Sequence, residues 1–179
     1  MMCNSKPKSS RRRGFTLIET ALATVIIGTG VLAIVFAQQT FHRQNDWAMR
    51  SAIGMQLGGE IREMMINLPR HDPVTGNSIW GVEDNELGIE DYDDVDDFHE
   101  GIFSFDLGNG PISAMRTTIP DLAGWSQRIE VRSVDPFDIQ ENVENGTSEM
   151  LRVEVHVEYQ GPLDMSPMEI TRLAWIQPR

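Results

Sequence analysis

The sequence predicts an α+β protein in which one long amino-terminal helix packs against an antiparallel sheet of about four strands. An uninterrupted apolar segment covers residues 15–37 and is followed by helix-forming sequence up to residue 68, with no proline between Pro7 and Pro69. Segments near the carboxyl terminus instead alternate apolar and polar residues, which is typical of strands with one buried face. A chain of 179 residues has room for one such domain.

Residues 1–14 form a basic leader that contains no acidic residue. Its basic residues are Lys6, Lys8, Arg11, Arg12 and Arg13. Without them the chain keeps 10 basic against 27 acidic residues, and its formal charge changes from −12 to −17. A surface this acidic repels phosphates, so we expect no nucleic-acid partner. The only cysteine, Cys3, lies in the leader, so the rest of the chain has no disulfide.

The apolar segment is long enough to cross a membrane. Its 23 residues carry one charged side chain, Glu19. As a helix it measures about 34 Å, against a hydrocarbon core of about 30 Å. Because the basic residues precede it, the amino terminus is expected in the cytoplasm and the remainder on the other side of the membrane.

Three interpretations of this segment remain open. It is a plain membrane anchor, a secretory signal cut after Val35-Phe36-Ala37 so that the mature chain begins at Gln38, or an assembly helix behind a leader that is cut before it. Glu19 distinguishes among them. A carboxylate at the bilayer centre costs about 2.5 to 3.5 kcal/mol, and an anchor or a signal gains nothing from it.

The stretch Gly14-Phe15-Thr16-Leu17-Ile18-Glu19 resembles the cleavage and methylation motif of type IV prepilins and type II secretion pseudopilins. The resemblance implies that a prepilin peptidase cuts between Gly14 and Phe15 and that Phe15 becomes the N-methylated first residue. It also implies that Glu19 guides methylation and subunit docking. An α-amino cation created at Phe15 of one subunit could then neutralise Glu19 of a neighbour.

This resemblance implies a minor pilin or pseudopilin precursor, a structural subunit of a type IV pilus-like or type II secretion filament. Its partners would be other pilin or pseudopilin subunits, the prepilin peptidase and the inner membrane. The head would then be periplasmic or extracellular. A further similarity, to minor pilins of the mannose-sensitive haemagglutinin type, rests on Asp94-Val95-Asp96-Asp97-Phe98 and Gly124-Trp125-Ser126. The absence of a disulfide from the head favours a minor subunit.

Residues 38–68 are expected to continue the helix as an amphipathic segment that Pro69 ends. Five glycines are expected to be weak points, since glycine costs about 1 kcal/mol relative to alanine in an exposed helix. They are Gly28, Gly30, Gly54, Gly58 and Gly59. Bulky residues recur at helical spacing at Phe41, Ala48, Ala52 and Met55. Ile61, Met64, Met65 and Leu68 then follow the i, i+3, i+4, i+7 pattern of a helix packed on one face.

The globular head, residues 69–179, begins with a loop-like segment up to residue 100. Seven potential ligands lie close together there: Asp91, Asp93, Asp94, Asp96, Asp97, His99 and Glu100. This density of oxygen ligands raises a calcium hypothesis, but the glycine and glutamate positions of an EF-hand loop are missing. We favour a solvated acidic turn and assign no metal ligand and no cofactor.

Strands are predicted over residues 101–105, 126–134, 151–159 and 170–176. The third alternates without a break, with apolar residues at odd positions.

No pattern of catalytic residues is recognisable. The four histidines are far apart, and Gly124–Arg128 does not fit the G-x-S-x-G nucleophile motif. We therefore expect no enzyme. The alternative function is a signal-anchored extracytoplasmic protein that binds a cation or another ligand.

Overall fold

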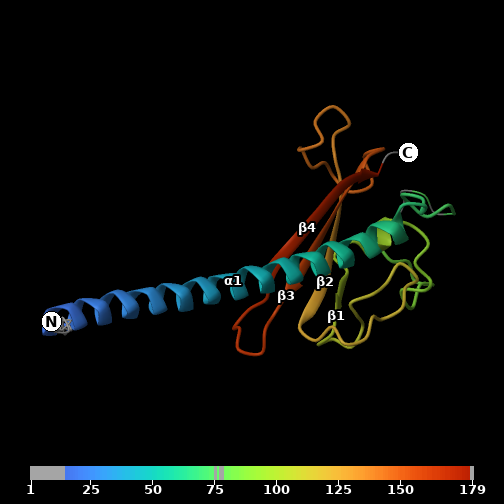
Figure 1. The fold of residues 1–179 in the computed structure, drawn as a ribbon. Helices are drawn as coiled ribbons and strands as arrows, with labels where there is room; N and C mark the ends of the chain where they lie inside the picture. Colours follow the sequence, from blue (N-terminus) through green and yellow to red (C-terminus); the bar gives the residue numbers. More distant parts are fainter. Residues whose placement is uncertain (1–14, 75, 77–78, 178–179) are drawn as a thin grey trace, which may run out of the picture. The chain divides into compact units, whose positions relative to one another are not determined.

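The computed structural model describes residues 15–74, 76 and 79–177, and confirms the predicted fold class. One helix, α1 (Leu17–Met65), precedes a sheet of four strands (Figure 1). The strands are β1 (Ile102–Ser104), β2 (Trp125–Ser133), β3 (Leu151–Tyr159) and β4 (Met168–Gln177). The chain divides into two compact units, residues 1–46 and 47–179, so that α1 begins in the first and ends in the second.

The described part of the first unit is almost entirely helix, and all its side chains are exposed. Its length and apolar composition would allow α1 to cross a membrane. The threonine hydroxyls of this part of α1 donate hydrogen bonds to carbonyl groups of the same helix. The Thr24 hydroxyl donates to the carbonyl of Thr20 at 2.8 Å, and that of Thr40 donates to the carbonyl of Phe36 at 3.0 Å. Such internal bonds leave few polar groups to be satisfied by water, which suits a helix in an apolar environment.

The sheet has the order β1-β2-β3-β4, and every neighbouring pair is antiparallel. Strands β2 and β3 pair along their full lengths, from Trp125 opposite Tyr159 to Ser133 opposite Leu151. Odd-numbered residues of both strands face the core, so the predicted alternation is confirmed. The bounds predicted for the third strand are those of β3. The last strand begins earlier than predicted, at Met168.

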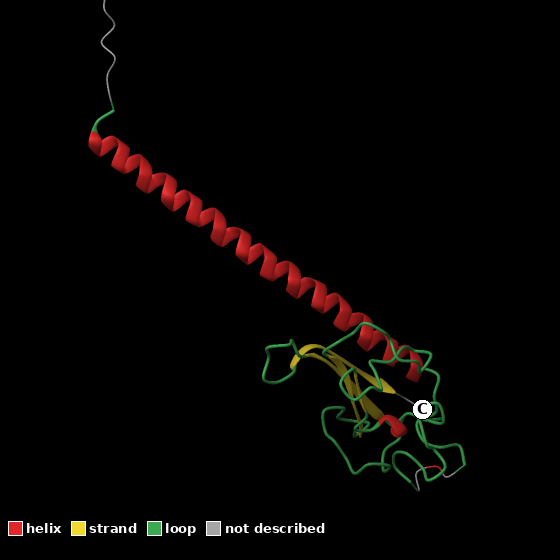
Figure 2. Ribbon diagram, turned by 90° about the horizontal axis from the view of Figure 1, so that it is seen from below, coloured by secondary structure: helices red, strands yellow, loops and turns green. Residues whose placement is uncertain are grey.

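The carboxyl-terminal part of α1 packs on this sheet (Figure 2). Its buried residues are Gly54, Leu57, Gly58, Ile61, Met64 and Met65. The prediction of a packed face is confirmed for Ile61, Met64 and Met65. Toward the amino terminus, Phe41, Ala48, Ala52 and Met55 are exposed, and the buried face is continued by Leu57 and two glycines.

Gly54 and Gly58 are sites of close packing, contrary to their interpretation as weak points. A Cβ atom at Gly54 would lie 2.7 Å from Oγ1 of Thr171, and one at Gly58 would lie 2.6 Å from Cδ1 of Leu173. Both partners belong to β4. The missing side chains therefore let the helix backbone approach the sheet.

The helix ends at Met65, three residues before the predicted end. The backbone N–H of Leu68 then donates to the carbonyl of Met65 at 3.1 Å, an i→i+3 bond of the kind that closes a tight turn. The chain thus leaves the helical path before it reaches Pro69.

A buried amide connects the helix, the sheet and a loop of the head. Gln127 on β2 is fully buried, and its Nε2 donates to the carbonyls of Leu57 at 2.9 Å and Ile112 at 3.1 Å. Its Oε1 accepts from the backbone N–H of Ile112 at 2.7 Å. One side chain therefore fixes the loop at Ile112 against α1.

Candidate functional site

The first turn of α1 is built by Thr16 and Glu19. The backbone N–H of Glu19 lies 3.4 Å from the Thr16 hydroxyl oxygen and 3.0 Å from the Thr16 carbonyl. Thr16-Leu17-Ile18-Glu19 has the T-x-x-E spacing of a capping box, in which threonine caps the first helical N–H groups. A glutamate in the first turn also interacts favourably with the helix dipole. The sequence analysis missed this structural role of Glu19.

The Glu19 side chain is exposed and has no ion pair with any residue that the structure describes. Phe15 is 77% exposed and precedes the helix by two residues. Gly14, on the other side of the predicted cleavage point, lies outside the described residues. The apolar helix surface around Glu19 is likewise uncovered by this chain.

Residues 9–35 match the family described as the prokaryotic N-terminal methylation motif. The chain carries the type IV prepilin and pseudopilin signature. This signature covers residues 9–14, outside the described residues, and the first part of α1. No curated protein and no solved structure matches the chain.

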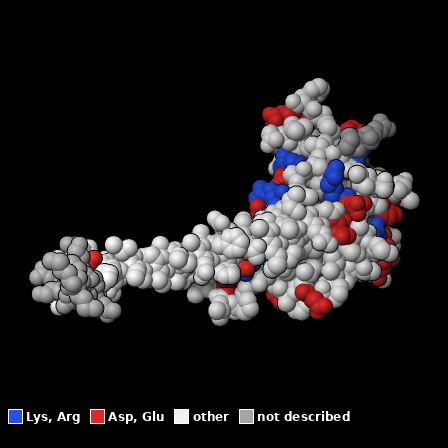
Figure 3. Space-filling model, viewed as in Figure 1, with Lys and Arg blue, Asp and Glu red and all other residues white. Residues whose placement is uncertain are grey.

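The prepilin signature together with the long apolar helix fits a protein anchored in the inner membrane. It indicates a pilin-like precursor and points to a structural subunit. Charged side chains are concentrated on the head, whereas the amino-terminal part of α1 is nearly free of them (Figure 3). The two parts are thus suited to different surroundings.

The acidic segment of the head is not the solvated turn that the sequence suggested. Asp94 and Asp96 are each 1% exposed and Asp97 is 2% exposed, while Asp91 and Asp93 are exposed. Asp96 and Asp97 belong to a short 3₁₀ turn, η2 (Asp96–Phe98), and Asp94 lies just before it. Phe98, the last residue of this turn, packs in the core. Because Phe98 is buried, the aspartates next to it in the turn are buried as well.

The carboxylates of Asp94 and Asp97 each accept a hydrogen bond from the backbone N–H of the other residue. Oδ1 of Asp94 accepts from the N–H groups of Asp96 at 2.8 Å and Asp97 at 3.1 Å. Oδ2 of Asp97 accepts from those of Asp93 at 3.0 Å and Asp94 at 3.2 Å. Each carboxyl group therefore uses one oxygen to hold two backbone N–H groups and so shapes the loop.

Asp96 instead makes a side-chain hydrogen bond to a histidine. Its Oδ1 lies 2.9 Å from Nδ1 of His71, and its Oδ2 accepts from the N–H of Gly81 at 3.2 Å. The His71 ring also contacts Trp80 at 5.8 Å between centroids. Burial, followed by the charge of Arg70, lowers the pKa of His71, which favours a neutral ring that donates Nδ1–H to Asp96.

Burial is the main cause of raised pKa values in these aspartates. It raises the pKa of Asp94 to about 8, with a further contribution from Asp96. It raises the pKa of Asp97 to about 7, to which the charges of Asp94 and Glu86 add, and that of Asp96 to about 6. The ionised forms are thus disfavoured unless a positive charge compensates them.

Two glutamates that the sequence analysis did not consider lie beside these aspartates. Glu83, Asp94 and Asp97 place one carboxylate oxygen each within 4.8 Å of one another, and so do Glu86, Asp93 and Asp97. We call these five residues the carboxylate cluster. The glutamates were missed because they lie in an earlier turn, and only the fold brings them to Asp97.

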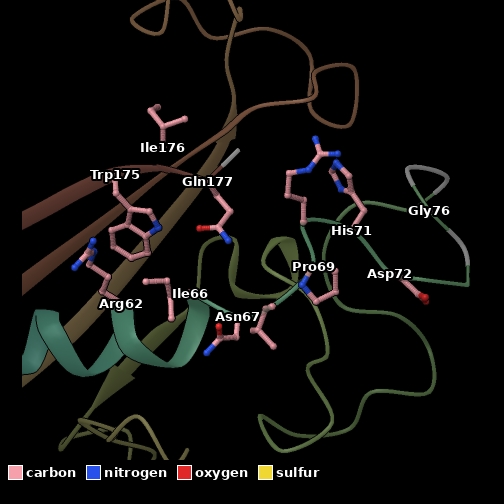
Figure 4. A pocket seen from close by; sticks show the side chains of 12 residues that line it. Arg62, Ile66, Asn67, Pro69, His71, Asp72, Gly76, Trp175, Ile176 and Gln177 are labelled. Carbon is pink, nitrogen blue, oxygen red and sulfur yellow. The ribbon is translucent and has the colours of Figure 1, made fainter. Parts of the chain in front are cut away.

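A groove of about 730 Å³ lies where α1 ends (Figure 4). Trp175 and Gln177 of β4 face Arg62 and Ile66 of the helix end and its following turn, and His71 lies on the opposite wall. Gly76 and Gln177 line the groove and are next in sequence to residues outside the described ranges. We assign no ligand to it.

Proposed function

We propose that the chain is the precursor of a minor pilin or pseudopilin, a structural subunit of a type IV pilus-like or type II secretion filament. Prepilin peptidase cuts it between Gly14 and Phe15 and methylates Phe15. The mature subunit stays in the inner membrane through residues 15–37, with its head on the far side, until it joins a filament. The prepilin signature on an uncovered apolar helix carries this proposal.

Glu19 has a defined part in this proposal. Its side chain has no charged partner among the described residues, although an unpaired carboxylate in an apolar environment is costly. Cleavage after Gly14 creates an α-amino cation four residues away. In a filament of staggered helices, the cation of one subunit compensates Glu19 of the next, while the apolar helix exchanges lipid for neighbouring helices.

The mature amino terminus tests the processing step. The chain is purified from native membranes, and its intact mass and terminal peptide are measured by mass spectrometry. We expect a chain that begins at N-methylated Phe15. A start at Gln38 would identify an ordinary secretory signal, and an uncut Met1 would identify a plain anchor; either result refutes the proposal.

Substitutions at the first turn separate charge from helix capping. Glu19→Gln keeps the capping-box pattern and removes the charge, whereas Thr16→Ala removes the cap and keeps the charge. We expect Glu19→Gln and Glu19→Val to be cleaved but excluded from filaments, and Thr16→Ala to assemble. Filament levels are measured by immunoblotting of sheared or pelleted filaments. Normal assembly of Glu19→Gln would mean that Glu19 serves only the helix cap.

A further inference from the structure

The strand β4 lies at one edge of the sheet, and among the described residues it pairs with β3 alone (Figure 1). An edge strand presents a row of backbone N–H and C=O groups that can pair with another chain, and proteins often protect it with proline, lysine or a bulge. β4 contains neither proline nor lysine, and its register shift lies near its beginning, opposite Val157 and Glu158. The proposed filament function gives no reason for this open edge.

Hydrogen bonds at the two ends of β2 and β3 show which residues pair through their backbones. The N–H of Val134 donates to the carbonyl of Met150 at 3.1 Å, and the N–H of Gln160 donates to the carbonyl of Gly124 at 2.8 Å. Directly opposite residues of antiparallel strands alternate between hydrogen-bonded and non-hydrogen-bonded pairs. Even-numbered residues of β3 therefore bond to β2, and its odd-numbered residues bond to β4.

The register of β3 and β4 then identifies the outward backbone groups of β4. Val155 lies opposite Leu173, so Leu173 and the odd-numbered residues after it bond to β3. The N–H and C=O groups of Arg172, Ala174 and Ile176 point away from β3. No group in the described ranges forms a hydrogen bond with these backbone atoms. Donors and acceptors at this regular spacing are satisfied together by an extended peptide backbone.

The opposite edge of the sheet, at β1, is closed by a side chain. Gly101 and Phe105 bond to β2, so the backbone groups of Ile102 and Ser104 point outward. Nδ2 of Asn109 donates to the carbonyl of Ile102 at 2.9 Å, and its Oδ1 accepts from the N–H of Ser104 at 2.9 Å. One amide thus bonds the edge of β1 as a further strand would. The sheet is therefore protected at β1 and open at β4.

A groove of about 410 Å³ lies between the outer flank of α1 and β4, with Met55, Gly59 and Leu173 among its lining residues. A Cβ atom at Gly59 would meet nothing within 4 Å, and Met55 is 59% exposed. A strand added to β4 would lie about 4.8 Å from it. Side chains directly opposite Leu173 share its face of the sheet and would enter this groove. The groove thus has room for the apolar side chains of a fifth strand.

The charge in the groove specifies the added strand further. Arg62 lines the groove, is exposed, and forms no ion pair with a carboxylate in the described part of the chain. It lies beside Trp175, the next residue of β4 after Leu173 on the same face (Figure 4). A strand with an apolar residue opposite Leu173 and an acidic residue opposite Trp175 would fill the groove and pair with Arg62.

A second copy of this chain is a poor occupant of the edge. Two β4 strands paired about a two-fold axis would set their α1 helices antiparallel, so the two chains would enter the pair from opposite ends. Subunits held in one membrane enter from the same side. Pairing of β4 with β1 of another copy would keep the helices parallel, but Asn109 already occupies the edge of β1.

We propose that the edge of β4 binds an extended segment of a different protein, which adds a fifth antiparallel strand to the sheet in the groove beside α1. The backbone groups of Arg172, Ala174 and Ile176 bind the segment. The groove selects an apolar side chain opposite Leu173 and an acidic one opposite Trp175. Antiparallel addition is favoured because its hydrogen bonds are perpendicular to the strands and slightly more stable than those of a parallel pair.

The first test uses a capped, fluorescein-labelled probe peptide, Thr-Glu-Thr-Val-Thr-Val-Thr, and the full chain in detergent. Aligned antiparallel, it places its first valine opposite Leu173 and its glutamate opposite Trp175. Binding is measured by fluorescence anisotropy. N-methylation of the first three threonines removes the N–H groups that face β4 and is expected to weaken binding about tenfold or more. N-methylation of the glutamate and both valines, whose N–H groups face away, leaves binding unchanged.

Two variants at one position provide the matching change in the chain. Ala174→Pro removes an outward N–H and is expected to weaken probe binding about tenfold. Ala174→Val keeps that N–H and should bind like the unchanged chain. Proline is tolerated where the N–H of an edge strand faces solvent, so urea unfolding should show that Ala174→Pro stays folded. If it unfolds, the N-methylated probes decide alone.

Hydrogen exchange tests whether the edge is occupied in the cell. Exchange of the amides of Arg172, Ala174 and Ile176 is compared between native membranes and the chain purified in detergent. We expect exchange in native membranes to be slower by about a hundredfold, because a fifth strand closes the edge. The amide of Leu173, which bonds to β3, serves as the internal reference and should exchange equally slowly in both.

Three results would overturn the proposal. The probe does not bind at millimolar concentration; or both N-methylated probes bind equally well, which would mean contact through side chains alone; or the three amides exchange equally fast in membranes and in detergent, which would mean that the edge stays open. The probe results do not depend on cleavage at Gly14 or on entry into a filament, so they stand apart from the proposed function.

Discussion

Asp94 and Asp97 are carboxyl groups whose ionisation opposes folding, because both are buried. Their pKa values are about 8 and about 7 in the folded chain, against a usual value of 3.8. At pH values between 3.8 and these raised pKa values, the folded state holds protons that the unfolded state has released. Stability from these two groups is therefore present at low pH and is lost as the pH rises through 7 and 8.

The chain is expected to become less stable between pH 6.5 and 8.5, by on the order of 2 kcal/mol. Burial lowers the pKa of His71 and His99, so their contribution changes mainly below 6.5 and does not mask the effect. Urea unfolding at a series of pH values measures this loss. Asp97→Asn should reduce it, and an unchanged slope in that variant would contradict the assignment.

Gln127 is expected to be the most sensitive polar residue of the head core. Gln127→Met removes three hydrogen bonds and leaves the buried N–H and carbonyl of Ile112 without the amide, at a cost of about 2 to 4 kcal/mol. The matched control is Gln140→Met, the same substitution at an exposed position. Chemical denaturation compares the two, and equal stabilities would show that the amide is dispensable.

At the level of elements, the contact between α1 and β4 depends on the absence of a side chain. Gly54→Ala would place a methyl group against Thr171, whose β-branched side chain has little freedom to move, and should cost about 1 to 3 kcal/mol. Gly59→Ala meets nothing within 4 Å and should stabilise the helix by up to about 1 kcal/mol. Thermal unfolding should shift in opposite directions; a stabilising Gly54→Ala would refute the packing argument.

The elements differ in how well their sequence predicts them. The strand β3 was predicted to the residue because its alternation is local and complete. The end of α1 was not, because the tight turn after Met65 depends on packing of the following chain. The roles of Gly54 and Gly58 were missed since their partners on β4 are more than one hundred residues away.

The candidate sites differ in the same way: a contiguous motif is predictable from the sequence, whereas a site assembled from separate segments is not. The prepilin signature is contiguous, and the family match confirms it at residues 9–35. The carboxylate cluster combines residues of two turns, and the burial of Asp94 and Asp97 follows from a neighbouring phenylalanine that inserts into the core. Composition alone therefore predicted acidic residues in that segment but placed them on the surface.

At the level of the whole molecule, the two units have different requirements. The first exposes its apolar helix surface, whereas all members of the hydrophobic core belong to residues 47–179. A fragment that begins at Trp47 is therefore expected to unfold cooperatively without detergent, while the full chain needs detergent or membrane to stay monodisperse. Circular dichroism and sedimentation velocity test both. Aggregation of the fragment would mean that the head core depends on the first unit.

The close approach of α1 to β4 also has an evolutionary consequence. Position 54 can accept a larger residue only if position 171 accepts a smaller one, because Oγ1 and Cβ of the β-branched Thr171 occupy the space. At position 58 the contacting atom is the end of the flexible Leu173 side chain, which can move away. Among divergent descendants of this sequence, positions 54 and 171 are therefore expected to change together, large for small, in the same lineages.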